Sequence, residues 1–399
     1  MGVTTARTSV GSPSIATERP ALAVADANWF TTENLFREVP ATRANTLLLK
    51  CIDYNNAWRR GLPPWAWGRA LSLREPGHWQ RDLVLPTGWM KRFPRVGMRP
   101  IGHSILRWRE SFARENRLVL VMTYPHYLFL RDQVKPDRHV YFNIDDYSQY
   151  WPRDADAVNL LERQAVRESD LTVCVSRLRA EELKAAVPEA AHRVRHLPHG
   201  SPTMAIAPRP LDRPSSPPLL ISHLPRPLLG YIGTLEDRVD WLLLTRLANR
   251  FPKASVVLVG RLDKGRPSGW RSDREHCLAL PNVHKLDWQP QEQIHAFNRS
   301  FDVCLIPYRV DHSFNRVCCP TKIMDYMATG RPIVSTALPE CMLYRKLFDV
   351  ADSSDEFLDA VCQIIAHDSD DGRAAMRHDW AKENTCRRTV ERLLSWLPK

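Results

Sequence analysis

The chain has 399 residues, a formal net charge of +11 and a hydrophobic fraction of 44%. This length exceeds the usual size of one hydrophobic core, so two domains are expected, and no apolar run reaches the roughly eighteen residues that a membrane-spanning helix needs. Nine scattered cysteines, without a Cys-x-x-Cys or Cys/His pair at zinc spacing, indicate a reducing, cytoplasmic compartment and no bound metal.

The first half of the chain follows a tail. Residues 1–20 are rich in Thr, Ser and Ala without a continuous apolar core, and they predict a disordered tail rather than a secretory signal. Residues 21–200 alternate short apolar runs with helix-length amphipathic stretches, which is typical of a parallel sheet covered by helices. Strands are predicted at 22–25, 46–52, 118–123, 139–143, 171–175 and 193–197, and helices at 156–168 and 177–186.

The segment Trp89–Arg117 carries most of the local excess of positive charge. Eight Lys and Arg residues stand there against Glu110 and Glu115, with Phe, Trp, Met and Ile interleaved. Such a mixture suits an anionic membrane surface. The alternative is a solvated basic face whose apolar residues point into the domain core. No nucleic-acid motif accompanies the segment, so nucleic acid is not expected as a partner.

A proline-rich stretch separates the two halves. Residues 201–227 are dense in Pro and Ser and predict an interdomain linker, with a hinge near His199-Gly200. Residues 228–399 again alternate strands and helices. Strands are predicted at 229–232, 255–259, 283–286, 303–306 and 333–335, and helices at 239–250, 291–298, 321–328, 356–366 and 380–397.

Ligands of open parallel sheets bind beyond the carboxyl ends of the strands, so the loops that follow the strands should carry the functional residues. Gly233 and Thr234 follow a strand and would let a phosphate approach the backbone closely. A lone Gly-Thr turn is more often only a turn, and the GxGxxG dinucleotide fingerprint is absent. Cations follow in the same loops and can complete a diphosphate clamp: Arg238, Arg261 and Lys264.

Residues 320–340 combine a cation and a carboxylate one helical turn apart, followed by a Gly-Arg-Pro stop and a new strand. Lys322 and Asp325 are at i and i+3 and share a helix face. Lys322 can neutralise a diphosphate while Asp325 accepts hydrogen bonds from sugar hydroxyls. Taken alone, such a pair is more often an ordinary surface ion pair.

The ordered pieces from Leu228 to Leu397 resemble the nucleotide-sugar half of a GT-B glycosyltransferase of the family-4 type, including its teichuronic-acid members. These pieces are Leu-Gly-Tyr-Ile-Gly-Thr-Leu-Glu-Asp-Arg, Ser-Val-Val-Leu-Val-Gly-Arg, Asn-Val-His-Lys-Leu-Asp-Trp, Phe-Asp-Val-Cys-Leu-Ile-Pro-Tyr and the Lys322 helix. Residues 140–148 and 171–176 extend the resemblance into the first half, whereas residues 1 to about 115 match poorly. The implied fold is α/β, GT-B, with two Rossmann-like domains facing across a cleft and a terminal helix that returns to the first domain.

The resemblance also implies roles for residues of the second half. The loop with Asp287 and Trp288 would hold the nucleobase, and Asp325 takes the place of the family's ribose-contacting glutamate. The partner glutamate of the family is replaced by Val317. Asp311 or Asn315, upstream in the same loop, can substitute by reaching the donor sugar.

In the first half, the resemblance points to an acceptor-binding domain. Asp145 and Asp146 end a strand, and Asp146 resembles in position the catalytic aspartate of some inverting GT-B enzymes, although an Asp after a strand often only caps a turn. His126 ends another strand and can touch the donor. The loop at residues 28–34, with Trp29, suits a sugar acceptor. Asp146, His126 and Lys322 are therefore the expected catalytic residues.

The implied function is transfer of a sugar from a nucleotide-diphosphate-sugar to a hydroxyl of a cell-surface polysaccharide or lipid-linked glycan. The donor is a substrate, and no cofactor or metal is expected. The family implies retention of anomeric configuration, whereas Asp146 acting as a base would imply inversion. The protein is expected in the cytoplasm, with docking on the inner membrane face through Trp89–Arg117. The alternatives are a GT-B nucleotide-sugar epimerase and, because of Val317, a non-catalytic GT-B interaction protein.

Overall fold

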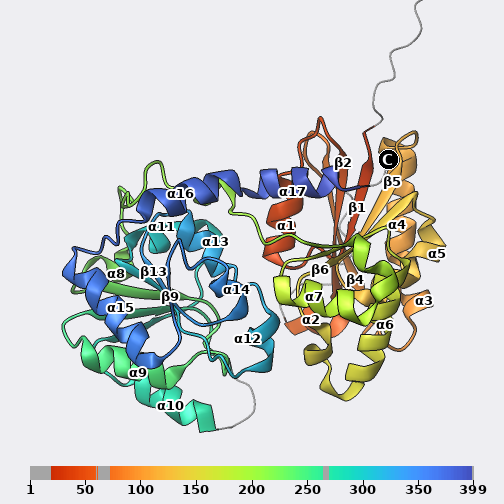
Figure 1. Ribbon diagram of the computed structural model, residues 1–399. Coiled ribbons are helices and arrows are strands. Elements are labelled where there is room, and N and C mark those ends of the chain that lie inside the picture. The colour runs from red at the N-terminus through yellow and green to blue at the C-terminus, as the bar shows by residue number, and fades with distance from the viewer. Residues whose placement is uncertain (1–18, 60, 62–71, 264–268, 398–399) are drawn as a thin grey trace, which may run out of the picture.

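The computed structural model describes residues 19–59, 61, 72–263 and 269–397. These residues form two lobes, each built on a largely parallel sheet with helices on both faces (Figure 1). Residues 1–18 of the predicted tail lie outside the described residues, and so does Lys264. Within the described part of the chain, no helix combines the length and apolarity that crossing a bilayer requires.

The N-terminal sheet has eight strands in the order β3-β4-β2-β1-β5-β6-β7-β8. Every neighbouring pair is parallel except β3 and β4, which form an antiparallel hairpin at one edge. All five residues of β1 and of β5 are buried, as expected for strands covered on both faces. The strands are β1 (Ala21–Ala25), β2 (Asn45–Asp53), β3 (Ser72–Glu75), β4 (His78–Leu85), β5 (Leu118–Met122), β6 (Arg138–Asn143), β7 (Leu171–Cys174) and β8 (Val194–His196).

Seven α-helices cover the described part of this sheet. Helix α7 begins with a side-chain cap, because the Ser176 hydroxyl accepts a hydrogen bond from the Arg179 amide. The helices are α1 (Phe30–Arg37), α2 (Tyr54–Arg59), α3 (Pro94–Gly97), α4 (Arg99–Phe112), α5 (Leu130–Val134), α6 (Ala155–Glu168) and α7 (Arg177–Ala186). Single 3₁₀ turns lie at Pro125–Phe129, Tyr147–Tyr150, Pro152–Asp154 and Pro188–Arg193.

The basic segment Trp89–Arg117 forms α3 and α4. Met98, Ile101, Ile105 and Trp108 are all buried against the sheet, so most of its apolar residues belong to the core. Phe93 and Val96 remain 69% and 56% exposed. The alternative of a core-facing helix with a solvated basic face therefore accounts for α4, while an exposed apolar and basic corner remains at α3.

The C-terminal sheet has six parallel strands in the order β11-β10-β9-β12-β13-β14. Its strands are β9 (Leu228–Ile232), β10 (Ser255–Val259), β11 (Val283–Leu286), β12 (Val303–Ile306), β13 (Ile333–Thr336) and β14 (Asp349–Ala351). The helices of this lobe are α9 (Trp241–Arg250), α10 (Gly269–Leu278), α11 (Gln291–Ser300), α12 (Ser313–Val317), α13 (Lys322–Met327), α14 (Pro339–Met342), α15 (Ser354–Ala366) and α16 (Ala374–Glu383).

The proline-rich segment 201–227 crosses between the lobes and then packs on the second one. It is not free of regular structure, because it contains a 3₁₀ turn at Thr203–Ala205 and the short helix α8 (Leu219–Ser222). The Ala207 amide donates to the Ala328 carbonyl oxygen at 2.9 Å. The Arg213 guanidinium lies 2.7 Å from the Asp302 carboxylate.

The chain crosses back at its C-terminal end. The predicted helix at 380–397 is in fact two helices, α16 and α17 (Cys386–Ser395), separated at Asn384-Thr385. Helix α16 lies on the C-terminal lobe and α17 on the N-terminal lobe beside α1 (Figure 1). The two crossings are bonded together, because the Ser201 amide donates to Asn384 and the Cys386 amide donates to Ser201, each at 2.9 Å. The return of the last helix to the first domain therefore agrees with the expectation.

Candidate functional site

A cavity of about 770 Å³ lies between the lobes at the carboxyl ends of the central strands. Both lobes line it. The N-terminal lobe contributes the loop after β1, with Asn28, Trp29 and Thr31, together with Asp145 and His199. The C-terminal lobe contributes the residues that the sequence placed after its strands: Gly233, Thr234, Arg238, Arg261, Trp288, Lys322 and Asp325.

Lys322, the first residue of α13, places its ammonium group over the ends of β9 and β12. Its Nζ lies 2.5 Å from the Tyr308 hydroxyl and 5.0 and 4.9 Å from the ring centroids of Tyr231 and Tyr308. The rings fix the cation by packing and by cation–π attraction. One positive charge is thus held at the cavity wall where an anionic ligand would meet it.

Two glycines let the backbone itself form the wall beside Lys322. A Cβ on Gly233 would lie 2.7 Å from the Lys322 Nζ, and a Cβ on Gly260 would lie 1.9 Å from the Gly233 carbonyl oxygen. A side chain at either position would therefore collide with the site. The Gly233 amide donates to the Val259 carbonyl oxygen at 2.9 Å, which ties the ends of β9 and β10 together.

Arg238 faces the same cavity and is held by the loop before α13. Its Nε donates to the Asn315 Oδ1 at 2.9 Å, and its guanidinium lies 4.3 Å from the centroid of the Phe314 ring. Asn315 is fully buried, and its Nδ2 donates to the Arg238 and Arg309 carbonyl oxygens. The direct sugar contact predicted for Asn315 is therefore corrected: the residue positions Arg238.

Asp311 is also placed differently from the expectation. Its carboxylate forms an ion pair with Arg309 at 2.7 Å, and its side chain is 68% exposed. The Arg309 partner holds the pKa of Asp311 below its usual value. Neither Asp311 nor Arg309 lines the cavity. The two side chains neutralise each other at the solvent-exposed surface.

The far end of the cavity is lined by Arg261 and Trp288. The Arg261 guanidinium lies 5.1 Å from the Trp288 ring centroid, and the indole is 54% exposed. Asn298 on α11 lines the same cavity, is 1% exposed, and its Oδ1 has no hydrogen-bond partner among the described residues. Sequence reasoning missed Asn298 because it sits inside an amphipathic helix, where an Asn reads as an ordinary polar position.

Asp325 lies on the cavity side of α13 with Lys322, as the i, i+3 spacing predicted. Burial raises the pKa of its carboxyl to about 7, against the opposing charge of Lys322. The group therefore changes its charge close to neutral pH.

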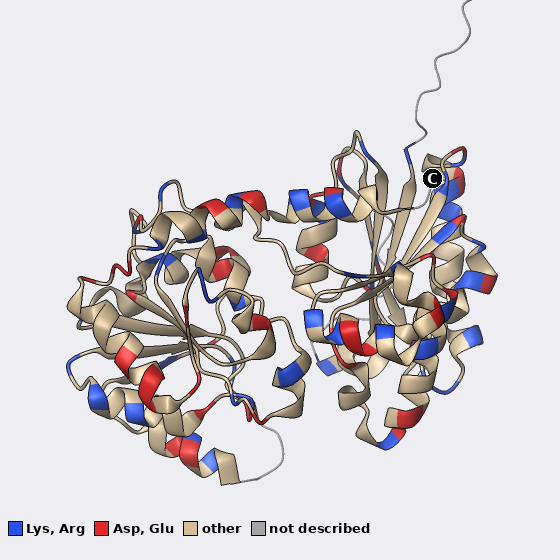
Figure 2. Ribbon diagram, viewed as in Figure 1, with Lys and Arg blue, Asp and Glu red and all other residues tan. Residues whose placement is uncertain are grey.

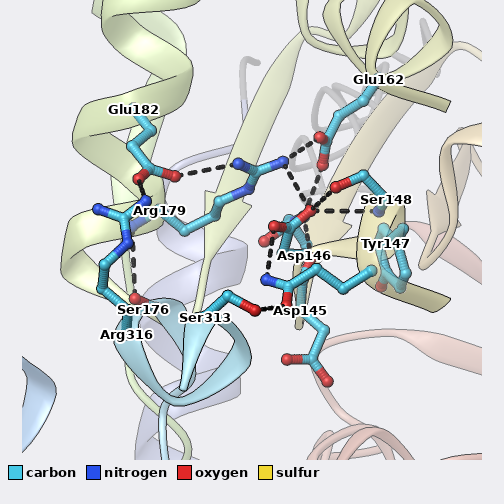
Figure 3. A network of polar contacts seen from close by, with 12 residues as sticks. Asp145, Asp146, Tyr147, Ser148, Glu162, Ser176, Arg179, Glu182, Ser313 and Arg316 are labelled. Atoms are coloured by element: carbon cyan, nitrogen blue, oxygen red, sulfur yellow. Dashed lines mark hydrogen bonds and ion pairs between the residues drawn. The ribbon is translucent and has the colours of Figure 1, made fainter. Parts of the chain in front are cut away.

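The two adjacent aspartates of the N-terminal lobe have separate surroundings (Figure 3). The Asp146 carboxylate accepts hydrogen bonds from the Ser148 amide and hydroxyl, at 3.1 and 2.6 Å, and from the Gln149 Nε2 at 2.8 Å. Burial alone would raise the pKa of Asp146, but these donors and the Arg179 charge outweigh it and hold the pKa below the usual value. Asp146 therefore orders a turn and does not line the cavity.

Asp145 is the aspartate that lines the cavity. Its Oδ2 accepts a hydrogen bond from the Tyr150 hydroxyl at 2.7 Å, and burial raises its pKa to about 6. Of the two adjacent aspartates, Asp145 and not Asp146 therefore faces the cavity. The pKa is raised by burial on Asp145 and lowered by hydrogen-bond donors on Asp146.

His126 does not line the cavity either. It is buried under Trp151, with ring centroids 5.1 Å apart, and burial lowers its pKa to about 4, with the nearby Lys91 adding to the effect. His199, which the sequence placed only at a hinge, lines the cavity instead, and burial lowers its pKa to about 4. The histidine at this site is therefore neutral at physiological pH.

Two lobes of this kind that face each other across a cavity form the GT-B fold, and here a cation and two strand-end glycines line one wall while a carboxylate lines the other. Residues 226–367 match the family described as Glycosyl transferases group 1. In sequence, 161 residues are 23% identical to TuaH of Bacillus subtilis, which carries the name of a teichuronic acid biosynthesis glycosyltransferase. The match covers 39% of this chain and 39% of that relative.

Solved structures confirm the fold over nearly the whole chain. A sucrose-phosphate synthase from Thermosynechococcus elongatus has a TM-score of 0.68 at 12% identity, covering 94% of this chain and 98% of its own. A trehalose-phosphate synthase from Burkholderia vietnamiensis has a TM-score of 0.65 at 13% identity, covering 95% and 100%. HepE of Anabaena, solved with UDP-glucose, has a TM-score of 0.63 at 11% identity, covering 95% and 100%. The GT-B fold is therefore confirmed, and the family match of residues 226–367 agrees with the resemblance to glycosyltransferases of the family-4 type over that part of the chain.

Proposed function

We propose that this protein is a glycosyltransferase that moves a sugar from a nucleotide-diphosphate-sugar to a hydroxyl acceptor during assembly of a cell-surface polysaccharide or lipid-linked glycan. The observation that carries this proposal is the composition of one cavity. Lys322 and Arg238 stand on its C-terminal wall beside bare backbone at Gly233, while Asp145 stands on its N-terminal wall. A diphosphate and a hydroxyl acceptor would meet between them.

On the donor wall, the two cations would bind the diphosphate and stabilise the negative charge that develops on it as the sugar leaves. This electrostatic role needs positions fixed in advance, and both side chains have them: Lys322 over two tyrosine rings and Arg238 on Asn315 and Phe314. Asp325 would accept from ribose hydroxyls. Trp288 and Arg261 would hold the nucleobase.

On the acceptor wall, Asp145 would accept a hydrogen bond from the acceptor hydroxyl, with Asn28, Trp29 and Thr31 forming the rest of that subsite. An aspartate with a pKa of about 6 is ionised at neutral pH, so it would orient the hydroxyl as a hydrogen-bond acceptor without serving as the base of an inverting displacement. We propose transfer with retention of configuration and without a metal ion.

The proposal includes a cytoplasmic location and docking on an anionic membrane face. The support is the corner formed by α3, where the exposed Phe93 and Val96 stand among the exposed Arg92, Arg95 and Arg99. Figure 2 marks the Lys and Arg positions of the described chain in blue. Exposed apolar residues among cations suit an interface with acidic lipid headgroups.

A thermal-shift panel of UDP-, GDP- and TDP-sugars tests donor binding and identifies the nucleobase. Mass spectrometry of a donor incubated with and without candidate acceptors then identifies the reaction. Transfer requires the acceptor, whereas an epimerase converts the donor alone. If none of the nucleotide-sugars raises the melting temperature of the protein, the proposal is contradicted and a non-catalytic role is favoured.

A further inference from the structure

Helix α12 of the C-terminal lobe contacts the donor wall with residues that also face the other lobe. Asn315 accepts the hydrogen bond from the Arg238 Nε, and the Phe314 ring packs 4.3 Å from the Arg238 guanidinium. A ligand that binds the Arg238 guanidinium would therefore also affect helix α12, because Asn315 and Phe314 hold that side chain in place.

Three contacts lead from α12 into the N-terminal lobe, and we call them the α12 clasp. The Ser313 hydroxyl donates to the Gln149 Oε1 at 2.7 Å, and the Arg316 guanidinium lies 2.6 Å from the Glu182 carboxylate. The Phe314 ring meets the Tyr150 ring edge-on, with centroids 5.5 Å apart. Phe314 therefore touches the donor-side arginine and the acceptor-side lobe at once.

On the N-terminal side, the clasp ends on the turn that carries the two aspartates (Figure 3). The Gln149 Nε2 donates to the Asp146 Oδ2 at 2.8 Å, while its Oε1 accepts from Ser313. The Tyr150 hydroxyl donates to Asp145 at 2.7 Å. Glu182 pairs with Arg179 at 3.0 Å, and Arg179 pairs in turn with the buried Glu162.

Both polar atoms of the Gln149 side-chain amide have hydrogen-bond partners in only one orientation of the amide. Its oxygen must face the Ser313 hydroxyl and its nitrogen must face the Asp146 carboxylate, because a carboxylate can only accept. The side chain thereby spans the space between the lobes. If either partner is lost, the amide keeps only one hydrogen bond, and its orientation is no longer fixed.

We propose that Gln149 is a positioning residue, and that the α12 clasp couples occupancy of the donor wall to the placement of Asp145 on the acceptor wall. The inference rests on the proposed function, because it requires a nucleotide at Arg238. Binding there would restrain Arg238, Phe314 and Asn315, and the clasp would pass that restraint to residues 145–150. Coupling of this kind is reciprocal, so an ordered acceptor turn would also favour the bound nucleotide.

Hydrogen exchange followed by mass spectrometry tests the coupling in the full chain. The probes are UDP, GDP and TDP, each used alone at saturating concentration. The reporting segments are 309–317 on the donor side and 143–151 on the acceptor side. The variants are Ser313→Ala and Gln149→Ala. Ser313→Thr keeps the hydroxyl, and Ser222→Ala removes a hydroxyl that bonds only within its own lobe, to the Leu219 carbonyl oxygen.

Without nucleotide, Ser313→Ala and Gln149→Ala should speed exchange in 143–151 by about two- to fivefold, the range expected for losing one hydrogen bond of modest strength. With nucleotide, the unaltered protein and Ser313→Thr should gain protection in both segments. Ser313→Ala should gain full protection in 309–317 but less than the unaltered protein in 143–151, because the Phe314 and Arg316 contacts of the clasp remain. Ser222→Ala should behave as the unaltered protein.

Equal nucleotide-dependent protection of 143–151 in Ser313→Ala and in the unaltered protein would overturn the coupling while leaving the proposed function standing. Absence of protection in 309–317 with all three nucleotides would overturn the proposed function, and the coupling with it. A kinetic readout completes the test: Ser313→Ala should lower kcat with acceptor by several-fold and raise the nucleotide Kd by a smaller factor. A merely structural role would instead lower the melting temperature without this split.

Discussion

The ammonium group of Lys322 lies 2.5 Å from the hydroxyl of Tyr308, at the point where β12 ends and the cavity begins. Tyr308 follows Pro307 directly after the end of β12, and Lys322 is the first residue of α13. The end of a strand and the start of a helix therefore lie together at the Lys322 ammonium group. Among the described residues, no carboxylate lies within ion-pair distance of this ammonium group, which is oriented toward the cavity.

Replacing this cation should weaken nucleotide binding while the fold persists. We expect Lys322→Ala to raise the Kd for the best nucleotide by about 10- to 150-fold, since a hydrogen bond to a charged group contributes about 1.5 to 3 kcal/mol. Isothermal titration calorimetry measures the change. Lys346→Ala, an exposed lysine on the same lobe, is the control and should leave Kd unaltered. An unchanged Kd in Lys322→Ala would remove the central claim about the donor wall.

Asp325 predicts a particular dependence of stability on pH. Its pKa is raised from 3.8 to about 7 by burial, so the folded state keeps a proton that the unfolded chain has released between about pH 4 and pH 7. The contribution of this carboxyl to stability therefore falls as pH rises through that window. The melting temperature of Asp325→Asn, relative to the unaltered protein, should be higher at pH 8 than at pH 5. Asp355→Asn, at an exposed carboxylate, should show no such trend.

The two adjacent aspartates should respond differently to the same substitution. Asp145→Asn should abolish most transfer and leave nucleotide affinity nearly intact, because Asp145 faces the cavity across from the donor wall. Transfer by the unaltered protein should rise with pH through about 6 as Asp145 ionises, and this rise should vanish from the residual activity of the variant.

Asp146→Asn serves as the comparison. Asp146 accepts three hydrogen bonds within its own turn, so its loss should lower the melting temperature and reduce kcat only through disorder of that turn. Full activity of Asp145→Asn together with an inactive, stably folded Asp146→Asn would reverse the assignment made from the geometry.

The exposed corner at α3 predicts salt-sensitive membrane binding. Vesicles containing anionic phosphatidylglycerol should sediment the protein at low salt and release it at high salt, because screening weakens attraction between surface charges. Reversing Arg92, Arg95 and Arg99 to Glu should abolish sedimentation. The same reversal at three exposed cations of the other lobe (Arg250, Lys253 and Lys346) should preserve it. Failure of the unaltered protein to sediment would return the segment to a solvated basic face.

The buried strands were the most predictable part of the fold. β10 and β12 have the predicted bounds, because strands covered on both faces are continuous apolar runs between turn residues. The edge strand β11, which is only partly buried, also has its predicted bounds. The edge hairpin of β3 and β4 was missed, since its half-exposed strands mix Arg, Gln and Asp with few apolar residues. Helix α4 was not predicted, because its many cations obscure the apolar stripe of Ile101, Ile105 and Trp108 in the sequence.

The candidate site was predictable where a strand end fixes a position, and not where distant partners decide it. Gly233, Arg238, Lys322 and Asp325 all line the cavity because parallel strands deliver their following loops to one edge. The choice between Asp145 and Asp146 depends on Arg179, more than thirty residues later in the chain, and adjacency in sequence carries no information about it.

The chain passes between the lobes twice, at Ser201 and at Asn384, and the two passages are bonded edge to edge. A Cβ on Gly200 would lie 2.6 Å from the Cys386 nitrogen, so the passages are also in close contact. A single strand between two bodies bends and twists about any axis, whereas two strands tied side by side resist torsion and flex most easily across their common plane. Twisting of one lobe against the other is therefore disfavoured, and the easiest motion is a change in the angle at which the two walls of the cavity face each other.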